Sequence, residues 1–353
     1  MSSAIITGIT GQDGSYLTEF LLAKGYDVVG WMRRASTNTI NERLETYLAN
    51  PKFHLVEADL TDMGSVSGAY NTTKEILGGA PGEFFNLAAQ SHVATSFSQK
   101  DFTTATNLLG VYHILDNIKD DGVRFLQAST SEIFGYEYDD DGTVKGQDEN
   151  TLMMPNSPYA IAKLGAHHAV HMYRDGYGLH GSCSICFNHE SPRRGEHFVT
   201  RKITIYVAKL KYMLSQHAAL PCLSDEQNIY VNGTKYPKLR LGNIDACRDW
   251  SHAKDMVRGM WMMLQQEKPD DYVLASGETH SVRDFVRLCF DYIGIENWES
   301  YVYIDKGLYR PVEVPYLLGI ADKAYLAFGW KPEYSFNDLV SDMMESDLDI
   351  YCN

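Results

Sequence analysis

Short apolar runs alternate with segments of helical periodicity along the first half of the chain. Runs rich in β-branched and aromatic residues predict strands at 4–7, 27–32, 53–57, 83–89, 123–127 and 181–187. Between them, apolar residues recur every three or four positions at 16–24, 103–119 and 159–173, which predicts helices. This regular order of strand and helix indicates an α/β protein with a Rossmann-type, doubly wound parallel sheet.

The pattern changes after Phe187. The polar stretch 188–195 has no periodicity, and the chain then predicts helices at 202–214, 253–266, 282–293 and 339–348 and a further sheet strand at 272–275. We therefore predict a Rossmann domain over 1–187, with a returning segment near 240–275. A smaller α/β domain is expected to consist mainly of 188–353.

Composition narrows the class of protein. The chain has 353 residues, of which 44% are hydrophobic, as in a folded globular protein. Its net charge of -15 disfavours nucleic acid and anionic membranes as partners. No apolar run approaches the ~20 residues that span a bilayer, and residues 1–8 do not resemble a signal peptide. We therefore expect a cytoplasmic protein, in which six scattered cysteines are reduced thiols.

Two groups of potential metal ligands are interpreted as structural. Cys183 and Cys186 are three residues apart in a predicted strand, so their sulfurs should point to opposite faces of the sheet. His167, His168 and His171 lie on one predicted helix, but no acid or cysteine joins them at metal-binding spacing in the sequence. We therefore expect no metal site.

A glycine-rich turn is predicted between the first strand and the first helix. Gly8, Gly11 and Gly14 are three residues apart, which lets the backbone turn tightly, approach a pyrophosphate and pack the helix against the strand. The first amides of the helix can then bind phosphates. The position of this turn favours a dinucleotide site over an ordinary loop.

The ends of the next strands indicate which dinucleotide binds. Arg33 and Arg34 stand where NAD-binding folds carry an acid for the ribose, and two guanidiniums suit a 2′-phosphate, so NADP is favoured over NAD. The alternative is a solvated basic pair. Asp59 and Leu60 are placed to meet the adenine, and Gln90-Ser91 should lie at the ligand crevice of the sheet.

A hydroxyl cluster that ends in a carboxylate, Ser129-Thr130-Ser131-Glu132, follows the fifth predicted strand. Downstream, Tyr159 and Lys163 are one helical turn apart and therefore share a helix face. A nearby ammonium stabilises a phenolate, so Tyr159 can accept a proton from an alcohol while hydride leaves the same carbon. Thr130 can donate a hydrogen bond to the oxygen that becomes a carbonyl. These residues predict a redox centre.

Glu132 indicates a further reaction step. Oxidation of an alcohol needs only the hydroxyl, the tyrosine and the lysine, so the carboxylate implies a second proton transfer. In a hexose oxidised at C4, the ketone acidifies the C5 proton, and Glu132 can remove this proton while the C6 hydroxyl leaves as water. Hydride return to C6 then completes a dehydration and regenerates the cofactor. The alternative is a carboxylate that is satisfied by backbone amides at a helix start.

Basic residues gather in the second half of this acidic chain. They are Arg193, Arg194, Lys202, Arg240, Arg248 and Arg310. Such a concentration is expected where a phosphorylated ligand binds, although some of these side chains can pair with surface acids.

Longer motifs extend these observations over nearly the whole chain. They are 8–17, 86–93, 127–132, Ser157-Pro-Tyr-Ala160 with Lys163, Phe187-Asn-His-Glu-Ser-Pro-Arg-Arg-Gly195, Phe198-Val-Thr-Arg-Lys-Ile203, Arg248-Asp-Trp250 and Arg310-Pro-Val-Glu-Val314. Together they resemble the extended short-chain dehydrogenase/reductase family and, within it, the GDP-mannose 4,6-dehydratases. Thr-Ser-Glu at 130–132 separates the chain from the dTDP-glucose dehydratases, which have Thr-Asp-Glu, and Glu132 separates it from the 4-epimerases.

The resemblance implies roles for three groups of residues. Catalysis would fall to Thr130, Glu132, Tyr159 and Lys163. Contacts to NADP are implied for Gly8, Ile9, Thr10, Gly11, Gln12, Asp13, Arg33, Arg34, Asp59, Leu60, Leu87, Ala88, Ala89, Gln90, Ser91, Lys163, His189 and Arg194. Contacts to a GDP-sugar are implied for Ser91, Ser131, Asn188, Val199, Lys202, Leu241, Gly242, Arg248, Arg310 and Glu313. Residues 1–187 would then bind NADP, and 188–353 mainly the GDP-sugar.

The reaction implied is the conversion of GDP-D-mannose to GDP-4-keto-6-deoxy-D-mannose and water, with NADP as a tightly held hydride carrier. A secondary reduction of the keto product towards GDP-D-rhamnose by external NADPH is a further hypothesis. The alternatives are a 4-epimerase and a non-catalytic NADP-binding scaffold. Apolar stripes on the helices predicted at 103–119 and 159–173 suit a four-helix interface, so we expect a homodimer or a homotetramer.

Two features depart from the family's pattern. Phe102 occupies the position of a tyrosine that usually lies near the cofactor, which removes one hydroxyl contact. The loop 136–147 is longer than usual and contains Asp139-Asp-Asp141, which we interpret as an exposed acidic loop rather than a cation site.

Overall fold

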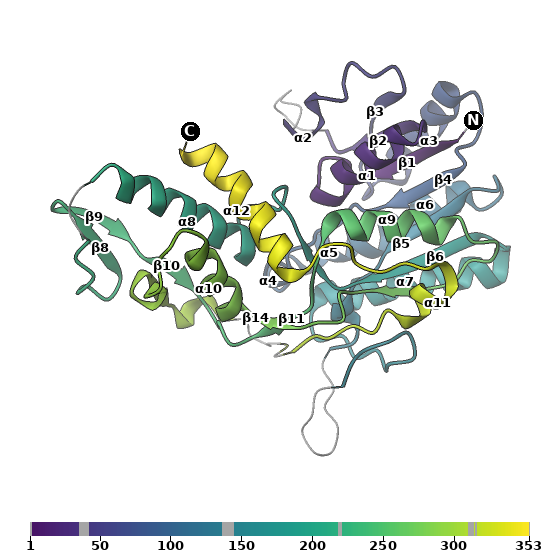
Figure 1. The fold of residues 1–353 in the computed structure, drawn as a ribbon. Coiled ribbons are helices and arrows are strands. Elements are labelled where there is room, and N and C mark those ends of the chain that lie inside the picture. Colours follow the sequence, from purple (N-terminus) through teal and green to yellow (C-terminus); the bar gives the residue numbers. More distant parts are fainter. Residues whose placement is uncertain are drawn as a thin grey trace.

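A parallel sheet forms the centre of the fold (Figure 1). The computed structural model describes residues 2–34, 42–135, 145–217, 221–309, 314 and 316–352. Within them, the order of the seven sheet strands is β13-β6-β5-β4-β1-β2-β3. The strands are β1 (Ser3–Thr7), β2 (Asp27–Met32), β3 (Phe53–Glu57), β4 (Glu83–Asn86), β5 (Arg124–Ala128), β6 (His180–Cys186) and β13 (Tyr272–Leu274). The predicted doubly wound sheet is confirmed, including the return of 272–275.

Helices cover both faces of this sheet. One face packs against α1 (Gln12–Ala23), α9 (Ala253–Leu264) and α11 (Asp322–Phe328), and the other against α3 (Met63–Leu77), α6 (Gly110–Ile118) and α7 (Pro158–Tyr177). Successive strand residues point to opposite faces, as with Phe84 and Phe85. Cys183 and Cys186 also divide between the two cores, as predicted.

The helix predicted at 103–119 is interrupted in the structure. Its parts are α5 (Lys100–Thr104), a π-helical turn η1 (Ala105–Leu109) and α6. Gly110 allows the close approach of this segment to the loop after β3, because a Cβ there would lie 2.8 Å from Cβ of Leu60. The prediction of a helical segment is therefore confirmed, although the extra residue of its π-turn redirects the side chains within it.

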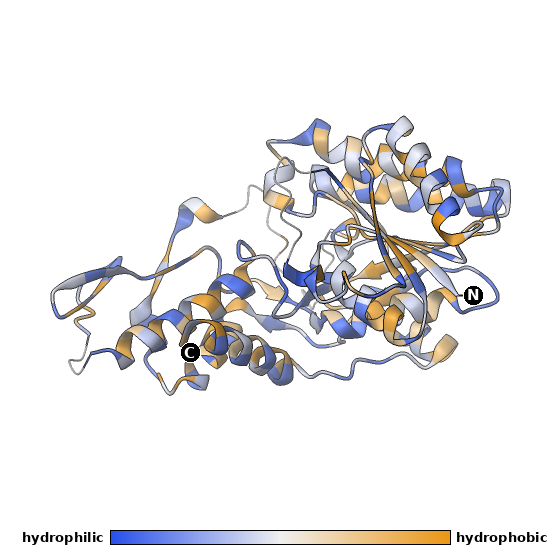
Figure 2. Cartoon of the chain, turned by 90° about the horizontal axis from the view of Figure 1, so that it is seen from above, coloured by the Kyte–Doolittle hydropathy of each residue, from blue (hydrophilic) through white to orange (hydrophobic). Residues whose placement is uncertain are grey.

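Three helices form a second core beside the sheet (Figure 1). They are α8 (Val199–Ser215), α10 (Val282–Tyr292) and α12 (Phe336–Cys352), with the hairpin β8 (Asn228–Val231) and β9 (Thr234–Pro237) at their outer end. Hydrophobic and hydrophilic residues alternate along the helices of both parts (Figure 2), as expected for helices that bury one face. No helix in the described part of the chain has the length and apolarity to cross a membrane.

Short strand pairs link segments that are far apart in the sequence. β7 (Asn188–Glu190) pairs in parallel with β12 (Trp250–His252), β11 (Cys247–Arg248) pairs with β14 (His280–Ser281), and β10 (Leu239–Leu241) pairs with β15 (Val302–Ile304). The remaining short elements are α2 (Glu42–Glu45), α4 (Val93–Ser96), η2 (Ser131–Ile133), η3 (Trp298–Tyr301) and η4 (Lys306–Leu308). These pairs bring loops from the second half of the chain against the carboxyl edge of the sheet.

Candidate active site

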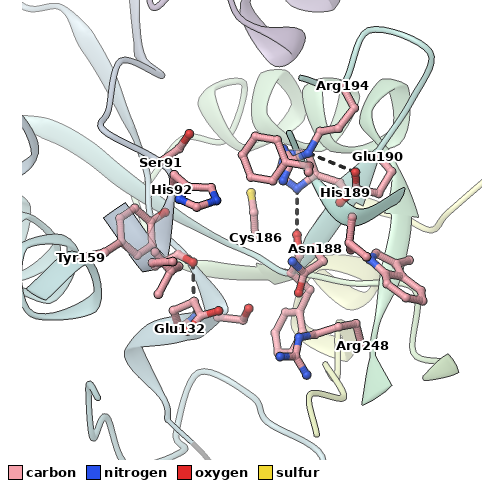
Figure 3. Close-up of a pocket in the computed structure, with 18 of the residues that line it drawn as sticks. Ser91, His92, Glu132, Tyr159, Cys186, Asn188, His189, Glu190, Arg194 and Arg248 are labelled. Atoms are coloured by element: carbon pink, nitrogen blue, oxygen red, sulfur yellow. Dashed lines mark hydrogen bonds and ion pairs between the residues drawn. The ribbon is translucent and has the colours of Figure 1, made fainter. Parts of the chain in front are cut away.

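A pocket of about 570 Å³ lies at the carboxyl edge of the sheet (Figure 3). Its lining includes the predicted catalytic residues Thr130, Glu132, Tyr159 and Lys163. It also includes Ser91, Ser131, Asn188, Val199, Lys202, Leu241, Gly242 and Arg248 of the predicted substrate group, and Asp13, Leu87, Ala89, His189 and Arg194 of the predicted cofactor group. Arg310, Glu313 and the acidic residues 139–141 lie outside the described residues. The structure therefore brings together residues that the sequence places up to 235 positions apart.

Tyr159 and Lys163 project from the first turns of α7. The side chain of Ser157 caps this helix, and the amide of Tyr159 donates to the hydroxyl of Ser96 at 3.2 Å. Nζ of Lys163 donates to the carbonyl of Ala128 at 2.8 Å and lies 6.0 Å from the centre of the Tyr159 ring. The helix start and the end of β5 therefore fix the two side chains relative to each other.

Burial dominates the electrostatics of this pair. It raises the pKa of Tyr159, while a hydrogen bond with the Thr130 side chain acts in the opposite direction. Burial also lowers the pKa of Lys163 to about 8. Positive charge brought near the phenol would oppose the effect of burial and favour the phenolate. Tyr159 would therefore release its proton more readily when a positively charged group binds beside it.

In the turn after β5, Thr130 and Glu132 face the pocket, whereas Ser129 contacts α7. The hydroxyl of Thr130 accepts from the amide of Glu132 at 3.3 Å and so caps the short helix η2. Glu132 and Tyr159 lie on the same side of the pocket (Figure 3). Ser129 also lines the pocket, but its hydroxyl lies 3.2 Å from Nδ1 of His167. The turn therefore presents Thr130 and Glu132 to a ligand, whereas Ser129 anchors the turn to α7.

The glycine turn fits a dinucleotide. Gly8 has φ +64°, and a Cβ there would lie 2.9 Å from the backbone of Ala88. A Cβ on Gly14 would lie 2.4 Å from the carbonyl oxygen of Gly8, so α1 packs directly against the turn. Gly11 precedes the first residue of α1, where helix amides are available to phosphate. The turn therefore combines a backbone that a pyrophosphate can approach closely with free amides at the start of a helix.

A buried polar pair joins this turn to β7. Nε2 of His189 lies 2.9 Å from Oδ2 of Asp13, and its Nδ1 lies 2.7 Å from the carbonyl oxygen of Phe187. Burial acts to raise the pKa of Asp13, but the charge and hydrogen bond of His189 outweigh it and lower this pKa to about 2. Burial acts to lower the pKa of His189, and Asp13 instead raises it. The pair therefore ties the cofactor turn to the opposite side of the pocket.

Four other residues of the predicted cofactor group, Arg33, Arg34, Asp59 and Leu60, follow β2 and β3 and lie outside the pocket lining. The guanidinium of Arg33 lies 5.9 Å from the centre of the Phe102 ring, so Phe102, where the resemblance leads us to expect a tyrosine, lies at the same end of the sheet. Arg34 is largely exposed and pairs weakly with Glu57 at 4.0 Å. Asp59 accepts hydrogen bonds from the amide and hydroxyl of Thr61.

The second half of the chain supplies polar groups to the opposite side of the pocket (Figure 3). Asn188 lies on β7, and its side-chain oxygen is buried without a hydrogen-bond partner among the described residues. Nζ of Lys202, on the first turn of α8, donates to the carbonyl of Arg240, and burial lowers the pKa of Lys202. Arg248 is buried and donates to the carbonyl of Cys247 at 2.8 Å. This side can therefore bind a polar, anionic ligand.

The Arg248-Asp249-Trp250 motif combines two pocket residues with one structural residue. The buried carboxylate of Asp249 accepts from the amides of Ser276, Gly277 and Gly319. Trp250 also lines the pocket and stacks on Phe336 of the second core. This motif therefore contributes both to the lining of the ligand site and to the junction that positions that lining.

Several pocket residues were not predicted from the sequence. His92, His197 and Phe198 form a ring cluster, with His92 centred 5.4 Å from His197. Behind the lining, Asn107 of the π-turn exchanges two hydrogen bonds with the backbone of Gln90, at 2.8 and 3.0 Å. His92 follows Gln90-Ser91 directly, so its position after the fourth strand was an available signal. The role of Asn107 depends on the π-turn, which helical periodicity does not reveal.

The histidines of α7 were interpreted as structural on the premise that no acid joins them, and this premise is wrong. An acid does join the histidines of α7, because Asp271 lies 2.5 Å from Nε2 of His171 and 3.9 Å from Nε2 of His167. Asp271 is 100 residues from His171 in the sequence and meets it only through the pairing of β13 with β6. Spacing along the chain therefore gave no indication of this contact.

The fold and the pocket together define the class of protein. A doubly wound sheet that brings Thr130, Tyr159 and Lys163 to one pocket is the arrangement of the extended short-chain dehydrogenases/reductases. The profile of one family, described as GDP-mannose 4,6 dehydratase, matches residues 5–225 and 226–343. The chain belongs to this family.

Individual relatives agree with this assignment. GDP-mannose 4,6 dehydratase 1 of Arabidopsis thaliana is 44% identical over 98% of this chain and 90% of its own length. Among solved structures, the UDP-glucose 4-epimerase of Thermotoga maritima has a TM-score of 0.79 at 19% identity and covers 99% of both chains. The structure of RMD from Pseudomonas aeruginosa complexed with NADPH has a TM-score of 0.73 at 20% identity, over 99% of this chain and 100% of that one. These two structures support the fold.

Proposed function

We propose that this protein converts GDP-D-mannose to GDP-4-keto-6-deoxy-D-mannose and water. One observation carries the proposal: Glu132, Tyr159 and Thr130 line one pocket in a chain of this family. The Arabidopsis relative is named for the same reaction. A 4-epimerase has no use for a carboxylate at Glu132, and a non-catalytic scaffold has no use for the tyrosine and lysine pair.

We propose NADP as the cofactor. Its support is the pair Arg33-Arg34 after β2, the fit of the glycine turn to a pyrophosphate, and the NADPH complex of a protein with the same fold. The glycine turn would hold the diphosphate, and Lys163 and His189 would lie towards the nicotinamide end. A bound nicotinamide supplies a place to store hydride within one turnover.

Two of the four catalytic side chains would transfer protons, and the other two would stabilise the charge that develops. Tyr159 accepts the proton of the sugar C4 hydroxyl, and Thr130 donates a hydrogen bond to the same oxygen. Lys163, fixed by the Ala128 carbonyl, adds positive charge near the phenolate. Glu132 removes the C5 proton, which distinguishes a dehydratase from an alcohol oxidase, and protonates the departing C6 hydroxyl. When hydride returns to C6, the proton that Tyr159 accepted passes to C5, so each side chain ends the turnover in its starting state.

We propose that the opposite side of the pocket binds the GDP portion, and that 188–353 is mainly the substrate domain. Lys202 and Arg248 would contact the diphosphate, since both are cations that line the pocket. Asn188 carries a buried acceptor without a described partner, which a donor on the ligand would satisfy.

The test is incubation of purified protein with GDP-mannose and no added cofactor. We expect a product lighter by one water, because hydride is taken up and returned within one site. An unchanged mass with C4 inversion would indicate an epimerase, and no turnover even with added NADP would indicate a scaffold. Excess NADPH added to the same reaction tests the proposed reduction towards GDP-D-rhamnose, since a persistent ketone would exclude it.

We also propose that two copies associate through α5, η1 and α7. Phe102, Leu109 and Ile161 on these helices are large apolar side chains that are at least 39% exposed in the single chain. Light scattering after gel filtration is expected to give a dimer or a tetramer, and Ile161→Glu should shift the protein to the monomer. A monomeric wild-type protein would exclude this interface.

A further inference from the structure

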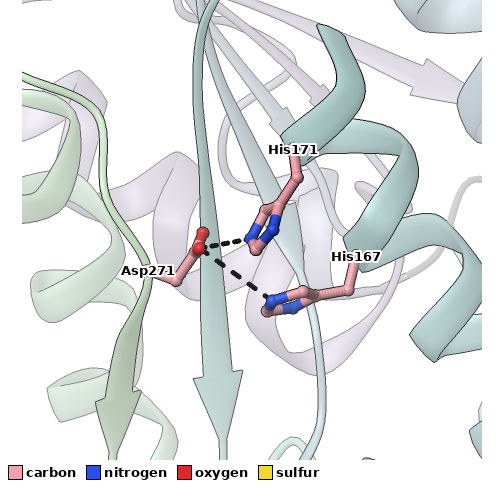
Figure 4. A group of neighbouring side chains, drawn as sticks. All are labelled: His167, His171 and Asp271. Atoms are coloured by element: carbon pink, nitrogen blue, oxygen red, sulfur yellow. Dashed lines mark hydrogen bonds and ion pairs between the residues drawn. The ribbon is translucent and has the colours of Figure 1, made fainter. Parts of the chain in front are cut away.

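Three potential metal ligands converge outside the pocket lining (Figure 4). His167 and His171 lie one turn apart on α7, and Asp271 immediately precedes β13. One ligand atom from each lies within 4.8 Å of the other two. Two histidines four residues apart on one helix face, completed by an acid from elsewhere, form a common type of zinc site.

The two oxygens of Asp271 face different partners. Oδ1 accepts from the amide of Cys183 at 2.8 Å and from Arg174 at 2.7 Å. Oδ2 faces Nε2 of His171 at 2.5 Å and Nε2 of His167 at 3.9 Å, with a second nitrogen of Arg174 at 3.2 Å. Arg174 forms a bidentate ion pair with both oxygens, and His171 adds a further contact to Oδ2. These contacts do not account for the second imidazole nitrogen, that of His167, which also faces Oδ2 at 3.9 Å.

The surroundings of His167 orient it as a ligand. Its Nδ1 lies 3.2 Å from the hydroxyl of Ser129, which leaves Nε2 directed at Asp271. Histidines that bind metals use their second ring nitrogen in this way. His167 is 1% exposed, whereas the side chain of His171 is 37% exposed, so the cluster opens to solvent on one side. That opening provides a path for an ion and space for a water ligand.

We propose that His167, His171 and Asp271 bind a divalent transition-metal ion of the zinc class, with water in the remaining position. A tetrahedral ion holds its ligand atoms about 3.3 Å apart. Asp271 would therefore move away from His171 by about 0.8 Å and towards His167 by about 0.6 Å, and the two imidazole nitrogens, which lie within 4.8 Å of each other, would also have to close to about 3.3 Å.

The chemical types of the three ligands also determine which ions the cluster can bind. Two imidazoles suit zinc, cobalt, nickel and copper, whereas magnesium and calcium prefer oxygen ligands throughout. The guanidinium of Arg174 faces the same carboxylate and opposes the charge of a cation, so affinity should fall below that of a structural zinc site. The site is therefore expected to bind reversibly rather than to retain its ion through purification.

Titration of the tag-free, metal-depleted protein with Zn²⁺ and with Co²⁺ tests the proposal. We expect one equivalent bound per chain, and a Co²⁺ absorption spectrum typical of four or five ligands. His171→Gln keeps a donor for Asp271 but removes one ligand, so it should weaken binding at least tenfold. His168→Gln makes the same change at the exposed neighbour outside the three-ligand group and should leave binding unchanged.

Two results would overturn the proposal: wild-type protein that binds no stoichiometric ion, or equal binding by the His171→Gln and His168→Gln proteins. Circular dichroism of both variants establishes that they are folded. The wild-type titration decides the question even if His171→Gln fails to fold. Mg²⁺ serves as the negative control ion, because it should not compete with Co²⁺ at this cluster.

Discussion

The two sides of the pocket are built in different ways. The side that carries Thr130, Glu132, Tyr159 and Lys163 lies directly at the ends of sheet strands and the start of α7. The opposite side, with Asn188, Lys202 and Arg248, depends on two- and three-residue strands that pair across long intervals of sequence. We call them the sheet side and the loop side.

We infer from this difference that the sheet side carries out the reaction and that the loop side recognises the substrate. A parallel sheet with helices on both faces is rigid, so it can hold reacting groups within the narrow tolerances that proton transfer requires. The loop side is held by junctions such as Asp249 and its three amide donors.

The largest expected effect is on the sheet side. Glu132→Gln removes the group that transfers the C5 proton, so water loss should fall by about 10²–10⁴-fold while C4 oxidation continues. Reduced nicotinamide should then accumulate, which its absorbance measures. Tyr159→Phe is the matched comparison, since it should abolish both C4 oxidation and water loss. If Glu132→Gln and Tyr159→Phe behave alike, the division of roles between these residues is wrong.

The sheet side was largely predictable from the sequence because local patterns determine it. Apolar periodicity located β1 to β6, and parallel strands collect their carboxyl ends at one edge, so Thr130 and Glu132 had to lie near Gln90-Ser91. Ser157 and Pro158 marked the start of α7 and thereby the position of Tyr159.

The remainder depends on contacts that no local pattern encodes. The pairing of Asn188 with Trp250 involves three-residue strands, too short for a recognisable alternation. Helix α3 was not predicted, because its buried side is only Val66, Ala69, Tyr70 and Thr73, a weakly apolar set. The approach of Asp271 to the histidines of α7 likewise follows from sheet order and not from spacing.

On the loop side, Lys202→Met tests recognition without chemistry. A charge-assisted contact contributes about 1.5–3 kcal/mol, so KM for GDP-mannose should rise by about 10–100-fold, with kcat nearly unchanged because the contact is made equally in ground and transition states. Lys211→Met is the control, since Lys211 is exposed on the same helix and does not line the pocket. A fall in kcat without a change in KM would place Lys202 in the chemistry instead.

The pair Asp13 and His189 joins the two sides, and its effect should depend on pH. One pKa unit corresponds to about 1.4 kcal/mol, so the fall in the pKa of Asp13 from 3.8 to about 2 corresponds to about 2 kcal/mol. At pH 6, Asp13→Asn should lower the free energy of unfolding by about this amount. Urea denaturation followed by fluorescence measures the change.

The sign of the pH dependence follows from both partners. Asp13 has a lowered pKa in the folded protein, so its contribution is complete above pH 3.8 and is lost as pH falls towards 2. His189 has a raised pKa, so the contribution is complete below pH 6.5 and is lost as pH rises through the folded value. The difference between wild type and Asp13→Asn should therefore be largest near pH 5–6. A difference that is constant to pH 9 would show that the charge of His189 is irrelevant.

The smallest expected effect concerns the cofactor end of the sheet side. Phe102 lies near Arg33, with the guanidinium 5.9 Å from the ring centre, and the resemblance leads us to expect a tyrosine near the cofactor at this position. Phe102→Tyr should restore a hydroxyl contact of about 0.5–1.5 kcal/mol, and so slow the loss of NADP on dialysis by up to about tenfold. Phe328→Tyr, a ring that packs against Tyr272 at the other edge of the sheet, controls for the added hydroxyl. Equal retention by both variants would mean that Phe102 acts only by stacking against Arg33, and that the tyrosine of the family makes no contact that this chain lacks.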